Sequence, residues 1–286
     1  MKNRYLFLHL FFIGILALTS CNPVVDNYPS VSGKVDPSSI EKANLLTYFP
    51  FESTSYSTIK SIGIDSSSVT YGAKDLFIAG QRGYSFQGDT TKSFIQFKLL
   101  ANKAFQNLKE FTLSSWIKLP DTKNNRVSKL IMIDGGDPAT GAGSLSISFD
   151  SLYMRGYLYS DSIDVKSHEI KIERSLLKSN QWVHIAFTYN DSTSTMAFYA
   201  NGIQLKEKTC FATADSTVKM GPLKLAKLNL TRLYIGAWAQ QVLGTTTASM
   251  MYFTGGIDEM RIWKKCLSKE SVSTLYKAEW SLAKNQ

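Results

Sequence analysis

The stretch WVHIAFTYNDSTSTMAFYANGIQLKEK, residues 182–208, carries the clearest structural pattern in this chain of 286 residues. Apolar side chains recur at every second position over residues 183–189, which is the period of a β-strand. The alternation breaks at Asn-Asp-Ser-Thr and resumes until Asn201-Gly202, a dipeptide that favours a tight hairpin turn because both residues tolerate positive φ. The stretch therefore predicts three consecutive antiparallel strands. His184 lies in the first of them and is expected to be structural rather than a ligand.

Similar runs extend over most of the chain. From Leu45 onward, segments rich in Val, Ile, Phe, Tyr and Thr alternate with segments rich in Gly, Asn, Asp and Ser. The expected strands are residues 45–51, 83–88, 94–99, 111–119, 129–136, 144–149, 154–160, 182–190, 195–205, 232–238 and 253–263. A helical pattern appears only at 267–280, with Ser268 as the expected N-cap. The pattern predicts an all-β, two-sheet antiparallel sandwich over residues 41–286, with one short C-terminal helix.

The N-terminus indicates export. Lys2 and Arg4 precede an apolar run over residues 6–18, which is typical of a secretory signal peptide ending at residue 20. The tetrad Leu-Thr-Ser-Cys that ends at Cys21 resembles a bacterial lipobox, which implies that Cys21 is acylated; an ordinary signal peptide with an incidental cysteine is the alternative. Residues 21–40, which contain several Pro and Ser, are expected to be a flexible tether.

Acylation at Cys21 would place the protein in the cell envelope. We expect an outer-membrane lipoprotein, because Asn22 is not the aspartate associated with inner-membrane retention; the side of the membrane that it faces is left open. The membrane would be contacted through the lipid anchor only. Nucleic acid is not an expected partner of an exported chain.

The charge is basic but dispersed. The formal net charge is +9, and it falls to +7 when the two positive charges of residues 1–20 are removed. The Lys-containing segments 98–109 and 219–227 contribute to this excess, which would suit anionic glycans or lipid headgroups; a solvated surface is the simpler interpretation. Cys210 and Cys266 are expected to be free thiols, with a disulfide between them as the alternative.

Residues 253–263, FTGGIDEMRIW, place two adjacent carboxylates inside an apolar run. At the strand period, Asp258 shares a face with Met260 and Ile262, whereas Glu259 points to the opposite face. Two carboxylates that point apart cannot flank one glycosidic bond, so this segment does not predict a glycosidase. A carboxylate on an apolar face needs a cation, an arginine or backbone N–H donors.

Catalytic motifs are missing from the rest of the sequence as well. The chain has no Cys and His metal cluster, no phosphate-binding glycine loop and no G-x-S-x-G nucleophile motif. We therefore expect no enzymatic activity and no catalytic residue. Acids brought together from distant strands are an alternative that spacing does not test.

Six segments in sequential order resemble the laminin-G-like, concanavalin A-like lectin/glucanase superfamily, and its bacterial, pentraxin-like branch in particular. They are LLTYFPFE, GYSFQG, FTLSSWIKL, WVHIAFTYN with FYANG, LYIGA, and GGIDEMRIWKKCLSKESV, and the resemblance covers most of residues 44–280. It implies a jelly roll, a fold used by lectins, adhesion modules and some glycanases, so it does not define one function. The alternating Glu, Asp, Glu pattern of the glycanase branch is missing here.

The same resemblance implies a calcium site. Members of the superfamily often bind a calcium ion near the rim through an Asp that precedes the final strand, the position of Asp258. Further oxygen donors for such an ion would be Glu52, Asp65 and Asp89. Gln87 stands where many relatives have an Asp, so a metal-free Asp258 held by hydrogen bonds is the alternative.

Two segments carry the residue types of sugar-binding sites, which combine an aromatic face with amide, carboxylate or guanidinium groups. The first is residues 236–253, with Trp238, Gln240, Gln241 and Tyr252. The second is residues 150–162, where one strand face would carry Tyr153, Arg155, Tyr157 and Tyr159. The structural alternatives are that Trp238 covers the edge of the core and that the second set makes cross-strand pairs.

The expected function is therefore lectin-like carbohydrate binding, accessory to glycan capture, with a glycan or glycoprotein as partner. Two alternatives remain open at the level of sequence. One is a protein interaction or adhesion module of a surface complex, and the other is a glycoside hydrolase of the concanavalin A-like fold.

Overall fold

The computed structural model describes residues 35–52, 60–72, 77–89, 92–101, 103–121, 126–135, 143–245 and 247–283. The expected signal peptide, Cys21 and residues 22–34 of the expected tether lie outside these ranges. Residues 37–39 form a 3-10 turn, η1 (Pro37–Ser39), and Ile40 accepts a hydrogen bond from the indole N–H of Trp263 (3.2 Å). The last residues of the segment predicted as a tether are thus attached to the domain.

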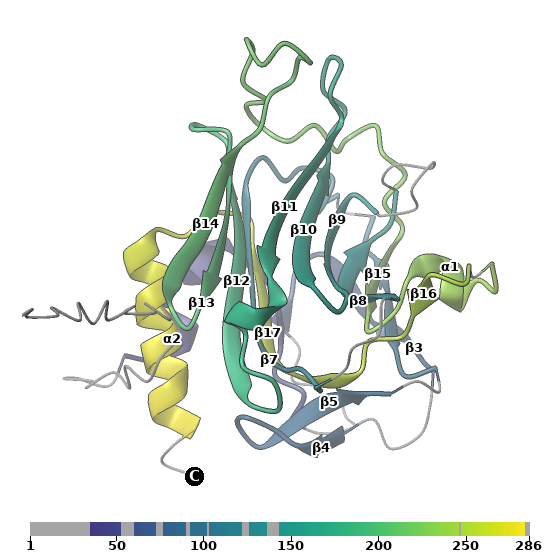
Figure 1. Ribbon diagram of the computed structural model, residues 1–286, viewed down its shortest axis with the longest axis vertical. Coiled ribbons are helices and arrows are strands. Elements are labelled where there is room, and N and C mark those ends of the chain that lie inside the picture. The colour runs from purple at the N-terminus through teal and green to yellow at the C-terminus, as the bar shows by residue number, and fades with distance from the viewer. Residues whose placement is uncertain are drawn as a thin grey trace, which may run out of the picture.

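Two antiparallel sheets pack face to face, as the sequence predicted (Figure 1). In the described residues the first sheet has nine strands: β1 (Leu45–Phe49), β2 (Lys60–Ser61), β4 (Phe77–Ala79), β5 (Tyr84–Gly88), β7 (Phe111–Lys118), β12 (Trp182–Asn190), β13 (Thr195–Ala200), β14 (Ile203–Thr209) and β17 (Gly255–Trp263). Seven of them follow the order β14-β13-β12-β7-β17-β1-β2, and β5 joins β17 and β4.

The second sheet has eight strands in the same ranges: β3 (Ile64–Tyr71), β6 (Ile95–Leu99), β8 (Val127–Ile133), β9 (Leu145–Phe149), β10 (Tyr153–Tyr159), β11 (Ser167–Glu173), β15 (Arg232–Ile235) and β16 (Met250–Met251). Its order is β11-β10-β9-β8-β15-β6-β3, with β16 paired in parallel to β8. Two further 3-10 turns are η2 (Lys42–Asn44), which directly precedes β1, and η4 (Arg174–Leu176), which connects β11 to β12.

The meander predicted from residues 182–208 is confirmed as β12, β13 and β14. The Asn190 side chain closes the first turn, because its Oδ1 accepts the backbone N–H groups of Ser192 and Thr193 (both 3.0 Å). Asn201 and Gly202 both have positive φ, as expected for the second turn. The inward residues of β12 join the core between the sheets, where the Phe187 and Phe198 rings lie 5.0 Å apart.

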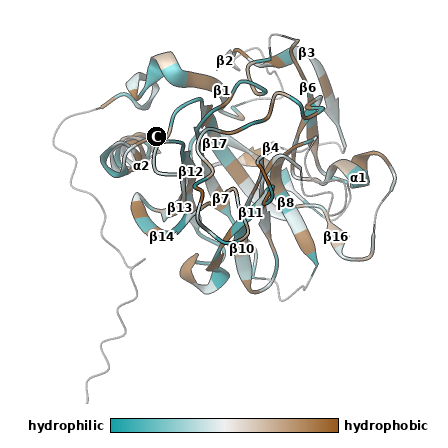
Figure 2. Cartoon of the chain, turned by 90° about the horizontal axis from the view of Figure 1, so that it is seen from above, coloured by the Kyte–Doolittle hydropathy of each residue, from teal (hydrophilic) through white to brown (hydrophobic). Residues whose placement is uncertain are grey.

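In the part of the chain that the structure describes, two α-helices lie on opposite sides of the sandwich (Figure 2). Helix α2 (Lys269–Ala283) packs on the outer face of the first sheet, and Ser268 caps it by accepting the N–H of Ser271 (3.1 Å). Helix α1 (Ala239–Val242) packs on the outer face of the second sheet and was not predicted, because four residues are too few to show a helical period. Neither helix in the described ranges has the length and hydropathy of a membrane span.

The prediction that Asp258 and Glu259 point to opposite faces is wrong. The register of β17 against β7 shifts after Asp258, and Glu259 has a positive φ of 49°, which marks a β-bulge. The bulge adds one residue, so Ile257 and Met260 both face the core and Asp258 lies beside Trp116 on the α2 side of the sheet. A strict period of two does not detect such an insertion.

The buried Asp258 carboxylate is held by backbone N–H donors. Its Oδ2 accepts the N–H of Arg82 (3.0 Å), and its Oδ1 accepts the N–H of Glu259 (2.8 Å). Burial and the neighbouring Glu259 carboxylate nevertheless raise the pKa of Asp258 well above its usual range. Asp258 is thus held by backbone N–H donors, one of the three kinds of partner that a carboxylate on an apolar face was expected to need.

A buried ionic network joins α2 to the first sheet through Arg261. Its guanidinium pairs with Glu259 (2.7 Å) and with Glu279 of α2, and lies 3.9 Å from the centre of the Tyr48 ring. Tyr48 donates its hydroxyl to Glu259 (2.8 Å), and the indole N–H of Trp116 donates to Glu279 (2.7 Å). The network therefore connects β1, β7, β17 and α2, and its carboxylates serve the structure rather than an open site.

The two later cysteines are free, as predicted. Cys210 is buried and Cys266 is partly buried. Burial raises the pKa of the Cys210 thiol to about 12 and that of Cys266 to about 11. Because the thiolate is the reactive form, both side chains behave as small apolar groups at neutral pH.

Candidate ligand-binding surface

The first predicted sugar site has its aromatic residue turned into the fold. Trp238 is 9% exposed, and its indole N–H donates to the Val127 carbonyl (2.8 Å). The Gln241 side chain accepts the Trp238 backbone N–H (3.1 Å) and so holds the start of α1, while the Gln240 carbonyl accepts the N–H of Thr245 (2.8 Å). These residues hold the α1 segment on the second sheet, which is the structural alternative considered for Trp238.

Tyr252, the other aromatic candidate of residues 236–253, is also packed against the fold. The Tyr252 ring stacks on Phe94 at 6.3 Å and is partly buried. Beneath Trp238, the ammonium of Lys129 lies 4.3 Å from the indole centre and donates to Ser146 (2.8 Å), and burial lowers the Lys129 pKa to about 7. The α1 segment therefore covers the β8 side of the outer face of the second sheet.

The second predicted site forms an open face. Along β10 the residues alternate between buried and half-buried, so the half-buried ones share the solvent side: Tyr153, Arg155, Tyr157 and Tyr159. On the neighbouring β11, every second residue is exposed: Ser167, Glu169, Lys171 and Glu173. Arg155 lies opposite Lys171 and Tyr157 opposite Glu169, so the two rows lie on the same face of the sheet. We call these eight residues the β10–β11 face.

Polar contacts fix the central side chains of this face. Arg155 pairs with Asp150 and, through its Nε, with Glu169 (3.2 Å). Its guanidinium carbon is 5.1 Å from the centre of the Tyr153 ring, and the Lys171 ammonium is 4.9 Å from the same centre. The Tyr157 hydroxyl donates to Ser167 (2.8 Å). Such a row of fixed tyrosine rings beside cations and carboxylates can pack against sugar rings and hydrogen-bond their hydroxyls.

Sequence reasoning missed the β11 half of the face. Residues 167–173, SHEIKIE, alternate between polar and apolar after the first two positions, which is a readable strand signal. The segment is short and its outward residues are mostly charged, so it was not among the expected strands. Glu169 and Lys171 are therefore candidate ligand-binding residues that the sequence analysis did not identify.

The four acids predicted as calcium ligands do not assemble. Glu52 accepts the backbone N–H of Tyr84 (3.3 Å) and so lies on the same turn that binds Asp258. Asp65 instead accepts the hydroxyl of Ser67 (2.6 Å), and Asp89 accepts that of Ser93 (2.6 Å). Within the described ranges no three His, Cys, Asp or Glu residues gather where they could hold a metal ion. The residues present therefore do not fit one shared calcium site.

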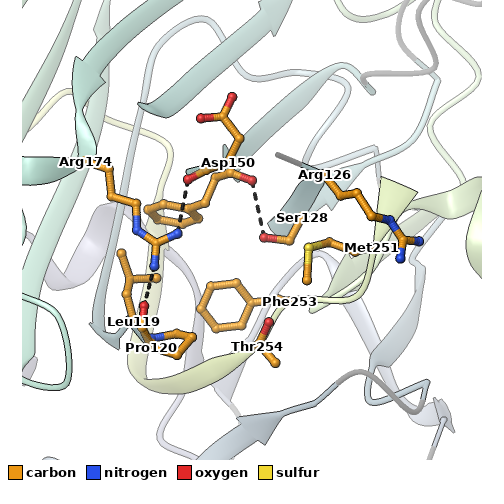
Figure 3. A pocket seen from close by; sticks show the side chains of 10 residues that line it. Leu119, Pro120, Arg126, Ser128, Asp150, Arg174, Met251, Phe253 and Thr254 are labelled. Atoms are coloured by element: carbon orange, nitrogen blue, oxygen red, sulfur yellow. Dashed lines mark hydrogen bonds between the residues drawn. The ribbon is translucent and has the colours of Figure 1, made fainter. Parts of the chain in front are cut away.

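A small pocket between the ends of the two sheets is closed by its own side chains (Figure 3). Arg174 donates to the carbonyls of Asp150 (3.1 Å) and Pro120, and Ser128 donates to that of Phe149 (3.4 Å). Its volume of about 10 Å³ is close to the minimum for a single water molecule. Arg174 is thus structural, and the pocket is too small to provide a sugar site.

A two-sheet antiparallel sandwich with one polar and aromatic sheet face is the architecture of a lectin-type jelly roll. The chain belongs to the concanavalin A-like lectin/glucanases superfamily, because the laminin G family model of that description matches residues 89–273. The predicted jelly roll and superfamily are therefore confirmed. A search of curated proteins found no match.

Solved structures of similar fold include binding domains of botulinum neurotoxins and of a mosquitocidal protein. The binding domain of Paraclostridial Mosquitocidal Protein 1 is 16% identical, with a TM-score of 0.56 over 82% of this chain and 52% of that chain. The receptor binding domain of botulinum neurotoxin D is 15% identical, with a TM-score of 0.55 and the same coverages of 82% and 52%. The binding domain of botulinum neurotoxin DC, solved in complex with SialylT, is 14% identical, with a TM-score of 0.54 and coverages of 84% and 52%. At these identities the likeness concerns the fold, and this chain spans about half the length of those chains.

Proposed function

We propose that the protein is a non-catalytic, lectin-like module that binds saccharide chains on the β10–β11 face. The observation that carries this proposal is the row of three half-exposed tyrosines and Arg155 on one strand. Neither helix covers this row: α2 packs on the other sheet, and α1 packs against Met132 and Tyr234 of β8 and β15. A seven-residue strand is about 23 Å long, enough for several sugar units in a row.

The acids that contact Arg155 support a role in binding without hydrolysis. Asp150 and Glu169 are both paired with Arg155, so each carboxylate orients the guanidinium. The other cluster of acids lies buried in the network around Arg261. We further propose that Cys21 anchors this module to the outer membrane, where it would assist glycan capture; the lipobox-like tetrad supports this part of the proposal.

A second candidate function for the same face is adhesion to a protein. Leu152, just before β10, and Ile163, just after it, are 63% and 62% exposed. Large apolar side chains at both ends of a polar and aromatic face are typical of protein-binding surfaces.

Replacing Tyr157 with alanine is expected to weaken binding of an oligosaccharide ligand by about fivefold, because one aromatic contact contributes on the order of 1 kcal/mol. The affinities are measured by isothermal titration calorimetry, with the ligand identified on a glycan array. The matched control is Tyr84→Ala, since Tyr84 is a 53% exposed tyrosine of the other sheet. Equal affinities of the Tyr157→Ala variant and the wild type would refute the assignment of this face.

A further inference from the structure

A second cavity lies at the end of the sandwich that β10 reaches. Its volume is about 570 Å³, and it is bounded by residues 106–109, residues 223–227 and Asp161. Backbone hydrogen bonds join these segments: Leu223 donates to the Lys109 carbonyl (2.9 Å), and Asp161 donates to the Lys224 carbonyl (3.0 Å). Figure 1 shows the connection from β14 to β15 crossing this end of the molecule. The two Lys-containing segments that appear dispersed in sequence thus meet at one site.

The charge of the cavity is positive. Lys109, Lys224 and Lys227 line it and are exposed, and Asp161 is the one acid among its ten lining residues. Asp161 is already paired with Lys166 (3.2 Å) and with Lys227 (3.8 Å). The hydrogen bond from Lys166 and the charges of the neighbouring lysines hold the Asp161 pKa below its usual value. An anionic ligand would therefore meet excess positive charge.

The wall of the cavity is formed by a fixed amide and by apolar side chains. Gln106 lines it, and its Nε2 donates to the Leu230 carbonyl (3.1 Å), which fixes the orientation of the amide. Its Oε1 is buried and has no hydrogen-bond partner. The buried side chains of Leu108, Leu223 and Leu225 give the cavity an apolar wall.

We propose that this cavity binds an acidic sugar, a ring that carries a carboxylate or a sulfate group. The lysines contact the oxyanion, and the leucines pack against the ring. The volume lies within the range of about 300 to 1,000 Å³ that small-molecule sites occupy. This site is separate from the β10–β11 face, and the inference does not rest on binding at that face.

The test uses the whole protein and measures binding of trigalacturonate, a sulfated galactose trisaccharide and neutral galactotriose by calorimetry. We expect at least one acidic probe to bind about tenfold or more tightly than galactotriose, and the Lys109→Gln/Lys224→Gln variant to lose about tenfold in affinity for it. The two acidic probes distinguish a carboxylate from a sulfate as the bound group. The control variant, Lys118→Gln/Lys206→Gln, removes the same charge from exposed positions elsewhere and is expected to bind like the wild type.

Three outcomes would overturn the inference. One is that neither acidic probe binds better than galactotriose. Another is that both double variants lose affinity equally, which would indicate a general attraction to a basic surface. The third is that inorganic sulfate binds as tightly as the acidic saccharides, since the leucine contacts would then contribute nothing. The Tyr157→Ala variant should keep full affinity for the acidic probe, so a failure at the β10–β11 face would be recognised separately.

Discussion

Replacing Arg261 with leucine is expected to lower the free energy of unfolding by about 3–5 kcal/mol, which would reduce the melting temperature by about 10 °C or more. Arg261 is 2% exposed and pairs with two carboxylates that are similarly buried, Glu259 and Glu279. Its removal leaves Glu279 without its paired cation and leaves Glu259 with the more distant Arg82 guanidinium (3.6 Å), in a site that water does not reach. It also removes the guanidinium that packs on the Tyr48 ring, so β1 and α2 lose their common partner.

Thermal and urea unfolding followed by circular dichroism measure this effect. Arg155→Leu is the matched control, because Arg155 is also paired with two acids but is 22% exposed, and a pair of that kind contributes about 1 kcal/mol or less. Adding Glu259→Gln and Glu279→Gln to Arg261→Leu should recover part of the loss, since the uncompensated charges are then gone. Equal losses for the two arginine variants would contradict the assignment of the Arg261 network as the main ionic support of α2.

Acid is expected to destabilise the protein through His184. The ring is fully buried between Trp116 and Tyr276, with centroid distances of 5.5 Å and 6.0 Å, and neither ring nitrogen has a hydrogen-bond partner. Burial and, to a smaller extent, the charge of Arg261 lower its pKa from 6.5 to about 3. Glu279 lies 3.7 Å from the Nε2 atom, but its charge is already paired with Arg261, so the imidazole stays neutral in the folded state.

The direction of this pH effect on stability follows from the protonation of His184 in the unfolded chain. Below pH 6.5 the unfolded chain protonates His184 and the folded chain does not, so the stabilisation is complete above that pH and is lost as the pH falls towards 3. The contribution is about 1.4 kcal/mol per pH unit over this interval. His184→Phe retains a ring against Trp116 and removes the titration, so its stability should decline less steeply between pH 6 and pH 4. Parallel pH profiles of the variant and the wild type in urea unfolding would refute this account.

The strands that sequence reasoning recovered are those with a clear alternation of large apolar side chains. Residues 182–190 are the best case, because their inward residues fill the core and no irregularity interrupts them. Strand β3 was missed because its residues, IDSSSVTY, are mostly small and polar and most of them are exposed at the edge of its sheet. The face of Asp258 was misassigned because the bulge at Glu259 depends on the pairing of β17 with β7, which local spacing does not contain.

The candidate sites likewise could be predicted only where they depend on neighbouring residues of one strand. The shared face of Tyr153, Arg155, Tyr157 and Tyr159 was predictable, since it follows from the period of one strand. The burial of Trp238 was not, because it depends on its contact with Val127, a residue more than 100 positions away. The lysine-lined cavity likewise forms only when residues 106–109 and 223–227 are brought together by the fold. Residue types along one strand are visible in a sequence, whereas sites built from separate loops are not.

A glycan array probed with the wild-type protein, in calcium and in chelator, tests the central claim most directly. We predict binding to a defined set of glycans, equal signals in both conditions because the four candidate acids do not assemble into one site, and reduced signals on the same glycans for Tyr157→Ala but not for Tyr84→Ala. Binding to no glycan in either condition would contradict the lectin-like function and would favour a protein partner for the β10–β11 face.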